Sequence, residues 1–147
     1  YVVSACLAGL PCRYDGNSRP CDAVKELQKQ HTLIPFCPEI YGGLPTPREP
    51  AERLGDSVVD RAGRDVTTEY RRGAEGALAL CRMYGCSCAV LKEKSPSCGS
   101  NKIYDGTFEG NLIDGQGTAV ELLRKEGVQV FSEEQLDQVE LLLAEEV

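Results

Sequence analysis

The chain has 147 residues, of which 41% are hydrophobic and 27% are charged, and its formal net charge is −7. This composition is typical of one globular domain, and no uncharged stretch approaches the ~20 apolar residues that a membrane-spanning helix needs. The acidic excess argues against extended binding to nucleic-acid phosphates, which requires clustered Lys and Arg. We therefore expect a single domain over residues 1–147 that does not span a membrane.

Strands and helices alternate along the first half of the chain. Residues 1–5 are aromatic, β-branched and then small, which favours a short buried strand, and residues 21–31 have the apolar spacing of a helix. Residues 32–36 are predicted as a second strand. It ends before Pro38, because proline cannot donate to a β-ladder. Residues 40–55 are rich in Gly and Pro and are predicted as a loop.

The second half continues the alternation. A small hairpin is predicted, in which residues 57–60 and 64–67 flank a turn at residues 61–63. A helix over 68–84 follows, which Thr67 or Thr68 caps and Gly85 ends. The elements predicted after this helix are a strand over 87–91, a Gly-rich and turn-broken stretch over 103–117, a helix over 118–126, a strand over 128–131 and a helix over 132–145 whose capping box is Ser132 with Gln135.

The alternation of helices with nearly continuous apolar strands is typical of an α/β domain with a parallel sheet. We expect a Rossmann-like three-layer fold, with a mainly parallel sheet of about four strands and a small hairpin.

The eight cysteines are the most informative residues of the sequence. Cys6, Cys37 and Cys98 follow the first three predicted strands. Since ligands of open α/β sheets bind beyond the carboxyl ends of the strands, we expect these three thiols to meet at one edge. Three thiolates suit a soft metal or an iron–sulfur cluster. Cys12 and Cys21 lie in or beside the first loop, so either is an alternative ligand to Cys6.

The spacing of the cysteines alone is compatible with two further hypotheses. The sequence has no ferredoxin-type C-x2-C-x2-C run, and buried thiols that simply fill the core account for the residues as well. Cys81 on an apolar helix face, and Cys86 and Cys88 on a strand, are predicted as such core residues. A structural zinc site is the other hypothesis, but zinc commonly takes ligands from close pairs, unlike the widely separated candidates here.

Five segments occur in an order that resembles a known family: Val3-Ser4-Ala5-Cys6-Leu7-Ala8-Gly9, Cys12-Arg13-Tyr14-Asp15-Gly16, Cys37-Pro38-Glu39, Pro47-Arg48-Glu49-Pro50 and Lys94-Ser95-Pro96-Ser97-Cys98-Gly99. Together they resemble a bacterial family long catalogued as a domain of unknown function. Some of its members are [4Fe-4S]-dependent thiouracil desulfidases, and the domain also occurs in a thiouridine-desulfurising relative. The similarity extends over about residues 3–131.

The resemblance implies a [4Fe-4S] cluster held by Cys6, Cys37 and Cys98 with one iron left open, and it places the catalytic side chains on Glu39 and Ser95. The expected reaction is a desulfuration without net electron transfer: the open iron binds a thiocarbonyl sulfur, a water positioned by Glu39 and Ser95 attacks carbon, and hydrosulfide leaves. From the residues alone, Glu39 is better interpreted as a turn cap or as the partner of an arginine.

Further expectations concern partners and location. Asp15 and Arg48 are candidates for binding the substrate, which we expect to be a small thiolated base or nucleoside. A tRNA substrate is not expected, because the tRNA-directed domain of some relatives has no counterpart in this sequence. The first residues lack the basic start of a signal peptide, which favours the cytoplasm. A non-catalytic iron–sulfur module that senses redox state or iron is the alternative function.

Overall fold

A computed structural model describes residues 1–18 and 20–135 of the chain. Its centre is a sheet of four parallel strands in the order β2-β1-β5-β8. The bounds of these strands are Val2–Ser4 for β1, Ile34–Phe36 for β2, Cys88–Leu91 for β5 and Gln129–Ser132 for β8. The predicted parallel sheet of about four strands is therefore confirmed.

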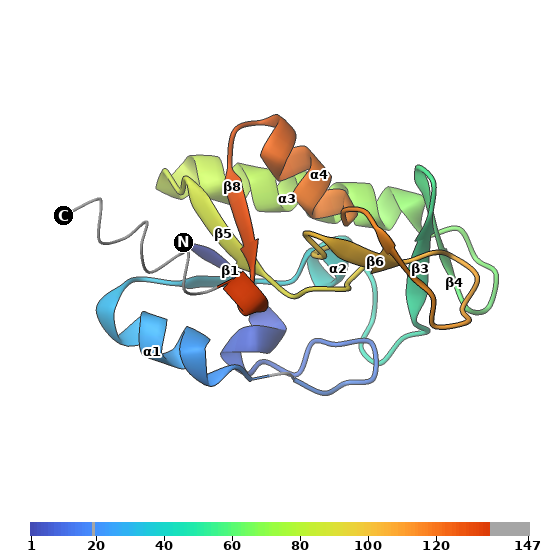
Figure 1. The fold of residues 1–147 in the computed structure, drawn as a ribbon, viewed down its shortest axis with the longest axis horizontal. Coiled ribbons are helices and arrows are strands. Elements are labelled where there is room, and N and C mark those ends of the chain that lie inside the picture. Colours follow the sequence, from blue (N-terminus) through green and yellow to red (C-terminus); the bar gives the residue numbers. More distant parts are fainter. Residues whose placement is uncertain (19, 136–147) are drawn as a thin grey trace.

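Helices cover both faces of the sheet, which gives three layers (Figure 1). Helix α1 (Asp22–Gln30) packs on one face, and α3 (Thr67–Tyr84) and α4 (Thr118–Lys125) pack on the other. Side chains of a strand alternate between the faces, so Val2 contributes to the core under α3 and α4 while Val3 contributes to the core under α1. No helix in the described part of the chain is both long and apolar enough to cross a bilayer.

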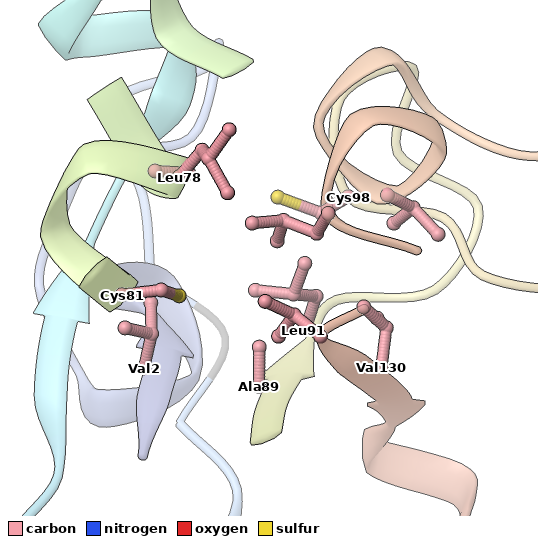
Figure 2. Packing of buried hydrophobic residues seen from close by; sticks show 11 residues of the cluster. Val2, Leu78, Cys81, Ala89, Leu91, Cys98 and Val130 are labelled. Carbon is pink, nitrogen blue, oxygen red and sulfur yellow. The ribbon is translucent and has the colours of Figure 1, made fainter. Parts of the chain in front are cut away.

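The core between α3 and the sheet is made of small and branched side chains. Figure 2 shows Leu78 and Cys81 of α3 on the side that faces Val2, Ala89 and Leu91 of the sheet. Cys81 and Cys88 are buried, and Cys86 packs against the same core. The prediction of core residues is confirmed for Cys81 and Cys88, whereas Cys86 is only partly buried and lies before β5.

Two antiparallel hairpins lie outside the sheet. Strand β3 (Ala51–Leu54) pairs with β4 (Ser57–Asp60), and β6 (Lys102–Tyr104) pairs with β7 (Leu112–Asp114). The hairpin predicted around residues 61–63 is present in part: β4 forms as predicted, Val59 bridges Asp65 in antiparallel orientation, and the amides of Asp60 and Val66 donate to Arg64 O and Val58 O at 2.9 Å. Residues 64–67 do not form a full strand, and the strand partner of β4 is β3, across the turn at Gly55. The strands are so short and half-exposed that their sequence has no clear alternation.

Helix caps differ in part from the predictions. Helix α3 begins after Val66 without a side-chain cap, because the Thr67 hydroxyl instead accepts a hydrogen bond from the Val58 amide at 2.9 Å. Gly85 ends α3 in a left-handed conformation, as predicted. The Ser132–Gln135 pair is also present, since Gln135 Oε1 accepts from the Ser132 amide at 3.0 Å. Most of the helix predicted over 132–145 lies outside the described residues. Its described part, residues 133–135, forms a 3₁₀ turn.

The strand order determines where a ligand site belongs. From β1 the chain moves outward to β2, and it returns to β5 on the opposite side of β1. The carboxyl ends of β1 and β5 therefore form a topological switch point, where open α/β sheets commonly bind ligands. The loops after β1, β2 and β5 all border this edge.

Candidate active site

A cavity of about 630 Å³ lies at this edge of the sheet. The loops after β1, β2 and β5 form its floor, and both antiparallel hairpins contribute to its wall. Its lining includes all the predicted site residues except Asp15: Cys6, Cys37, Cys98, Glu39, Ser95 and Arg48. The structure therefore brings together residues that are up to 92 positions apart in the sequence (Cys6 to Cys98).

Asp15 lies outside this lining, on an exposed turn. Its carboxylate accepts a hydrogen bond from the Asn17 amide at 3.0 Å, and this bond holds the pKa of Asp15 below its usual value. Arg13, which lies 3.7 Å from the same carboxylate, does line the cavity, as does Tyr14. Asp15 thus shapes the turn that carries two lining residues.

The cysteines reach the cavity from three separate elements. Cys6 lies in the 3₁₀ turn Ala5–Ala8 after β1, Cys37 is the N-cap of helix α2 (Pro38–Tyr41), and Cys98 lies in the loop after β5. Cys12 also lines the cavity, and its thiol interacts with those of Cys6 and Cys37. Cys21 instead packs at the start of α1, outside the lining.

The surroundings of Cys37 and Cys98 oppose ionisation of their thiols. Burial raises the pKa of Cys98 to about 12, and the neighbouring Cys12 thiol together with burial raises the pKa of Cys37 far above its ordinary value. In the absence of a cation these groups are thiols, which are poor nucleophiles. A coordinated metal deprotonates a thiol outright, so the site is better suited to coordination than to thiolate nucleophilic attack.

The arrangement suits a cluster better than a single ion. Within residues 1–18 and 20–135, no three His, Cys, Asp or Glu side chains converge as ligands of one metal ion. In a cubane, each thiolate binds a different iron atom, so its ligands stand further apart than those of a single ion. Soft thiols from three loops around a cavity of about 630 Å³ are a donor set that fits such a cluster.

Helix α2 positions Glu39 through close packing on α3. Glu39 follows Pro38, which occupies the first position of α2, where a missing N–H has no cost. Two glycines permit the approach of the helices: a Cβ on Gly73 would lie 2.0 Å from Pro38 O, and one on Gly42 would lie 2.0 Å from Glu69 O. Only glycine fits at these two contacts.

Three side chains hold the Glu39 carboxylate. Oε1 accepts from the Tyr70 hydroxyl at 2.7 Å and from Arg48 Nη2 at 3.2 Å, and Oε2 accepts from Ser97 Oγ at 3.0 Å. Burial and the charge of Glu39 raise the pKa of Tyr70, so Tyr70 remains a donor. Arg48 also donates to Cys12 O at 3.0 Å and thereby ties the first loop to the carboxylate. The arginine partner that the residues alone suggested for Glu39 is Arg48.

The loop that carries Ser95 and Cys98 is held by its own backbone. Ser95 Oγ accepts from the amides of Ser97 and Cys98, both at 3.2 Å, and lies 3.0 Å from Ser97 Oγ. The first turn of α4 adds two bonds, because the amides of Thr118 and Ala119 donate to carbonyls of the loop at 3.0 and 2.9 Å.

A second carboxylate, Glu93, anchors the far end of this loop. Glu93 is 3% exposed and accepts from the amides of Ser100, Asn101 and Lys102 at 2.9–3.1 Å. Burial alone would raise the pKa of Glu93, but these amide donors outweigh it and the pKa lies below its ordinary value. A buried anion thus fixes the backbone around Cys98.

The sequence reasoning missed several residues of the site. Ser97 belongs to the Ser-Pro-Ser-Cys-Gly segment, and its position next to Cys98 could have indicated that it lies in the site. Tyr70 lies on α3, where its spacing indicates only a core residue. Arg61 and Phe108 reach the cavity from loops of the two hairpins, with the guanidinium 5.7 Å from the ring centroid, and neither has a local signal.

Comparisons with known proteins identify the family of this chain. A sequence model of the family described as 2-thiouracil desulfurase matches residues 1–135. The chain belongs to the 2-thiouracil desulfurase family. The resemblance inferred from the five segments is therefore confirmed, and so is the enzyme class, since desulfurases of this family cleave C–S bonds.

Two relatives of this desulfurase family extend the comparison. The uncharacterized protein YbbK of Bacillus subtilis (strain 168) is 40% identical over 148 residues, which cover 94% of this chain and 98% of YbbK. A solved structure described as the [4Fe-4S]-dependent thiouracil desulfidase TudS is 52% identical, with a TM-score of 0.93, and covers 97% of this chain and 96% of that one. This similarity agrees with the α/β fold described above.

Proposed function

We propose that this protein catalyses the iron–sulfur-dependent, non-redox desulfuration of a thiolated pyrimidine such as thiouracil. The observation that carries the proposal is the lining of one cavity by Cys6, Cys37 and Cys98 together with Glu39 and Ser95. The 52% identical TudS is described as a [4Fe-4S]-dependent thiouracil desulfidase, which supports the same cofactor and substrate class here.

Cys6, Cys37 and Cys98 would hold the cluster. When bound, a cluster with three protein ligands supplies an open, Lewis-acidic iron for a thiocarbonyl sulfur. The raised pKa values of Cys37 and Cys98 mean that the folded protein alone holds these groups as thiols, so assembly releases protons.

Glu39 acts on the attacking water. Arg48 and Tyr70 occupy Oε1, and Ser97 donates one hydrogen bond to Oε2. A carboxylate oxygen accepts two hydrogen bonds, so Oε2 keeps one acceptor position for a water. Because the guanidinium and the phenol fix the carboxylate, its geometry is set before the water binds, and Glu39 accepts the proton of that water.

Ser95 complements Glu39 on the Cys98 side of the cavity. Its hydroxyl donates a hydrogen bond to the atom of the substrate on which negative charge develops. A cavity of about 630 Å³ has the size of a small-molecule site, and its aromatic lining by Phe36, Tyr104 and Phe108 suits a planar ring. We therefore propose a free thiolated base or nucleoside as substrate, and not tRNA.

The cysteines also support a reducing location. All eight are free thiols in the structure. Disulfides form in oxidising compartments, and exposed thiol ligands are oxidised there. We place the protein in the cytoplasm.

The experiment is anaerobic reconstitution of the protein with iron and sulfide, followed by a sulfide-release assay with 2-thiouracil, 4-thiouracil and their nucleosides. Glu39→Gln is compared with the wild type and with Glu49→Gln, an exposed carboxylate nearby. We expect all three proteins to have equal iron and sulfide contents, and Glu39→Gln to lose activity by at least about 10²-fold.

Two results would contradict the proposal. A fully loaded wild type that releases no sulfide from any of these compounds would favour the non-catalytic iron–sulfur sensor. A Glu39→Gln variant that turns over at the wild-type rate would remove Glu39 from the reaction and leave the activity in place.

A further inference from the structure

A buried carboxylate that the proposed reaction does not use lies in the hairpin wall of the cavity. Glu52 belongs to β3, is 9% exposed and lines the cavity. Its Oε1 accepts hydrogen bonds from the amides of Gly106 and Phe108, both at 3.1 Å. An ionised carboxylate offers about four acceptor positions, two on each oxygen, so the capacity of Glu52 is only half used.

The second oxygen of Glu52 is open. Both hydrogen bonds that its side chain makes within residues 1–18 and 20–135 end on Oε1. In this part of the chain, Thr118 Oγ1 is the one fully buried side-chain polar atom that has no hydrogen bond, so Oε2 of Glu52 is in contact with solvent. Because Glu52 lines the cavity, this open acceptor suits a ligand that donates a hydrogen bond.

The turn that Glu52 holds carries an aromatic side chain of the same wall. Phe108 lines the cavity and has a φ of 61°, a left-handed conformation that is unusual for a bulky residue and is found at ligand sites. Since Glu52 Oε1 lies 3.1 Å from the Phe108 amide, the open oxygen of the same carboxylate lies beside the Phe108 side chain. A planar ring that stacks on Phe108 therefore has its edge next to Glu52.

We propose that Glu52 accepts a hydrogen bond from the ring N–H of the substrate and thereby selects thiolated uracils over thiolated cytosines. The inference rests on the proposed function and names a residue that determines its substrate class. In 2-thiouracil and 4-thiouracil, the ring nitrogen N3 carries a hydrogen, in the free bases and in their nucleosides alike. In 2-thiocytosine the same nitrogen has a lone pair instead.

The carboxylate distinguishes these two kinds of ring by charge and by hydrogen bonding. It only accepts, so it binds the N3 hydrogen of a uracil and repels the N3 lone pair of a cytosine. A site that hydrogen-bonds a polar group of its substrate discriminates against analogues without that group, because its own buried atom is then left unpaired. Glu52→Gln inverts the pattern, since the amide oxygen still accepts from the turn while the amide NH₂ takes the place of Oε2.

The test measures binding and turnover separately on the cluster-loaded protein. Calorimetry gives the affinities for uracil, N3-methyluracil and cytosine, and a sulfide-release assay gives kcat and KM for 2-thiouracil and 2-thiocytosine. Glu52→Gln is compared with Asp60→Asn, because Asp60 is 5% exposed, lies on the paired strand β4 and does not line this cavity. Iron and sulfide contents and urea unfolding are measured first for each protein.

We expect the wild type to bind uracil about 10–10²-fold more tightly than cytosine or N3-methyluracil. Glu52→Gln should bind uracil at least about tenfold more weakly and cytosine more tightly than the wild type does. With 2-thiouracil its loss should lie in KM, with kcat within about threefold of wild type, because the hydrogen bond is present before and during the reaction. Asp60→Asn should keep the wild-type preference.

Three results overturn the role of Glu52: equal affinities of the wild type for the three bases, a Glu52→Gln variant that keeps the wild-type preference, or a loss that lies in kcat alone. The wild-type affinities need no variant, so the inference remains testable even if Glu52→Gln does not fold. Sulfide release without a preference for the N–H refutes this inference only. Selective binding of uracil by a loaded wild type that releases no sulfide refutes the proposed function instead.

Discussion

Gly73→Ala tests whether helix packing positions the candidate base. A Cβ at this position would lie 2.0 Å from Pro38 O, and ordinary contact begins at 3.4 Å, so α2 and α3 must separate by about 1.4 Å. Glu39 is attached to Pro38 and Tyr70 belongs to α3, so a shift of this size would lengthen their 2.7 Å hydrogen bond to about 4.1 Å.

Two opposing effects act on stability. Alanine is favoured over glycine by about 1 kcal/mol in a helix, whereas overpacking of a rigid backbone contact costs about 1–3 kcal/mol. We expect the free energy of unfolding to fall by up to about 2 kcal/mol. The rate of sulfide release should fall by about 10²-fold, because this is the typical cost of displacing a reacting group by about 1 Å.

Gly76→Ala is the matched control on the same helix. Its Cβ would meet the Tyr41 ring at 2.3 Å, but Tyr41 is 58% exposed and its side chain can turn away. Urea unfolding, iron content and single-turnover sulfide release are measured for both variants. Gly76→Ala should stay within about 1 kcal/mol of wild type and keep its rate. The reasoning is refuted if Gly73→Ala is as active as Gly76→Ala.

Three further predictions follow from single side chains. Tyr70→Phe removes a buried donor from Glu39, so we expect the free energy of unfolding in urea to fall by about 1–2 kcal/mol and the rate of sulfide release to fall about tenfold. An unchanged rate would show that Arg48 and Ser97 suffice to fix the carboxylate. Glu93→Gln should destabilise the protein most at neutral pH. Because the folded pKa of Glu93 is lowered, its contribution is complete above the ordinary Glu value of about 4.3 and disappears as the pH falls through the folded pKa. Urea unfolding from pH 7 to pH 3.5 should therefore show the difference from wild type shrinking with acid, and a constant difference would contradict the role of the charge. Cys12→Ser should retain iron and sulfide contents, whereas Cys98→Ser should lose them; equal losses would make Cys12 a ligand.

Local patterns sufficed for the sheet and its helices. The strand over 87–91 and the helix over 68–84 were predicted within one residue of β5 and α3, because their apolar spacing is long enough to distinguish a strand from a helix. Of the two hairpins, β4 was predicted, but its partner β3 was placed in a loop and the pair of β6 and β7 was missed. Their strands have three or four residues and lie half-exposed against loops, so no alternation could develop and only tertiary contacts pair them.

The sequence by itself indicated that Cys6, Cys37 and Cys98 meet at one edge of the sheet, because each follows a strand whose carboxyl end lies there. Glu39 and Ser95 were assigned by the resemblance of their segments to the desulfidase family. Tertiary structure alone decided how they are connected. Glu39 and Ser97 are 58 residues apart, and Glu39 and Tyr70 are 31 apart, so their hydrogen bonds depend on how closely α2 approaches α3 and how α4 holds the Cys98 loop. Side-chain contacts over such separations are set by packing, which periodicity does not encode; for the same reason only the fold shows that Asp15 lies outside the cavity and Arg48 inside it.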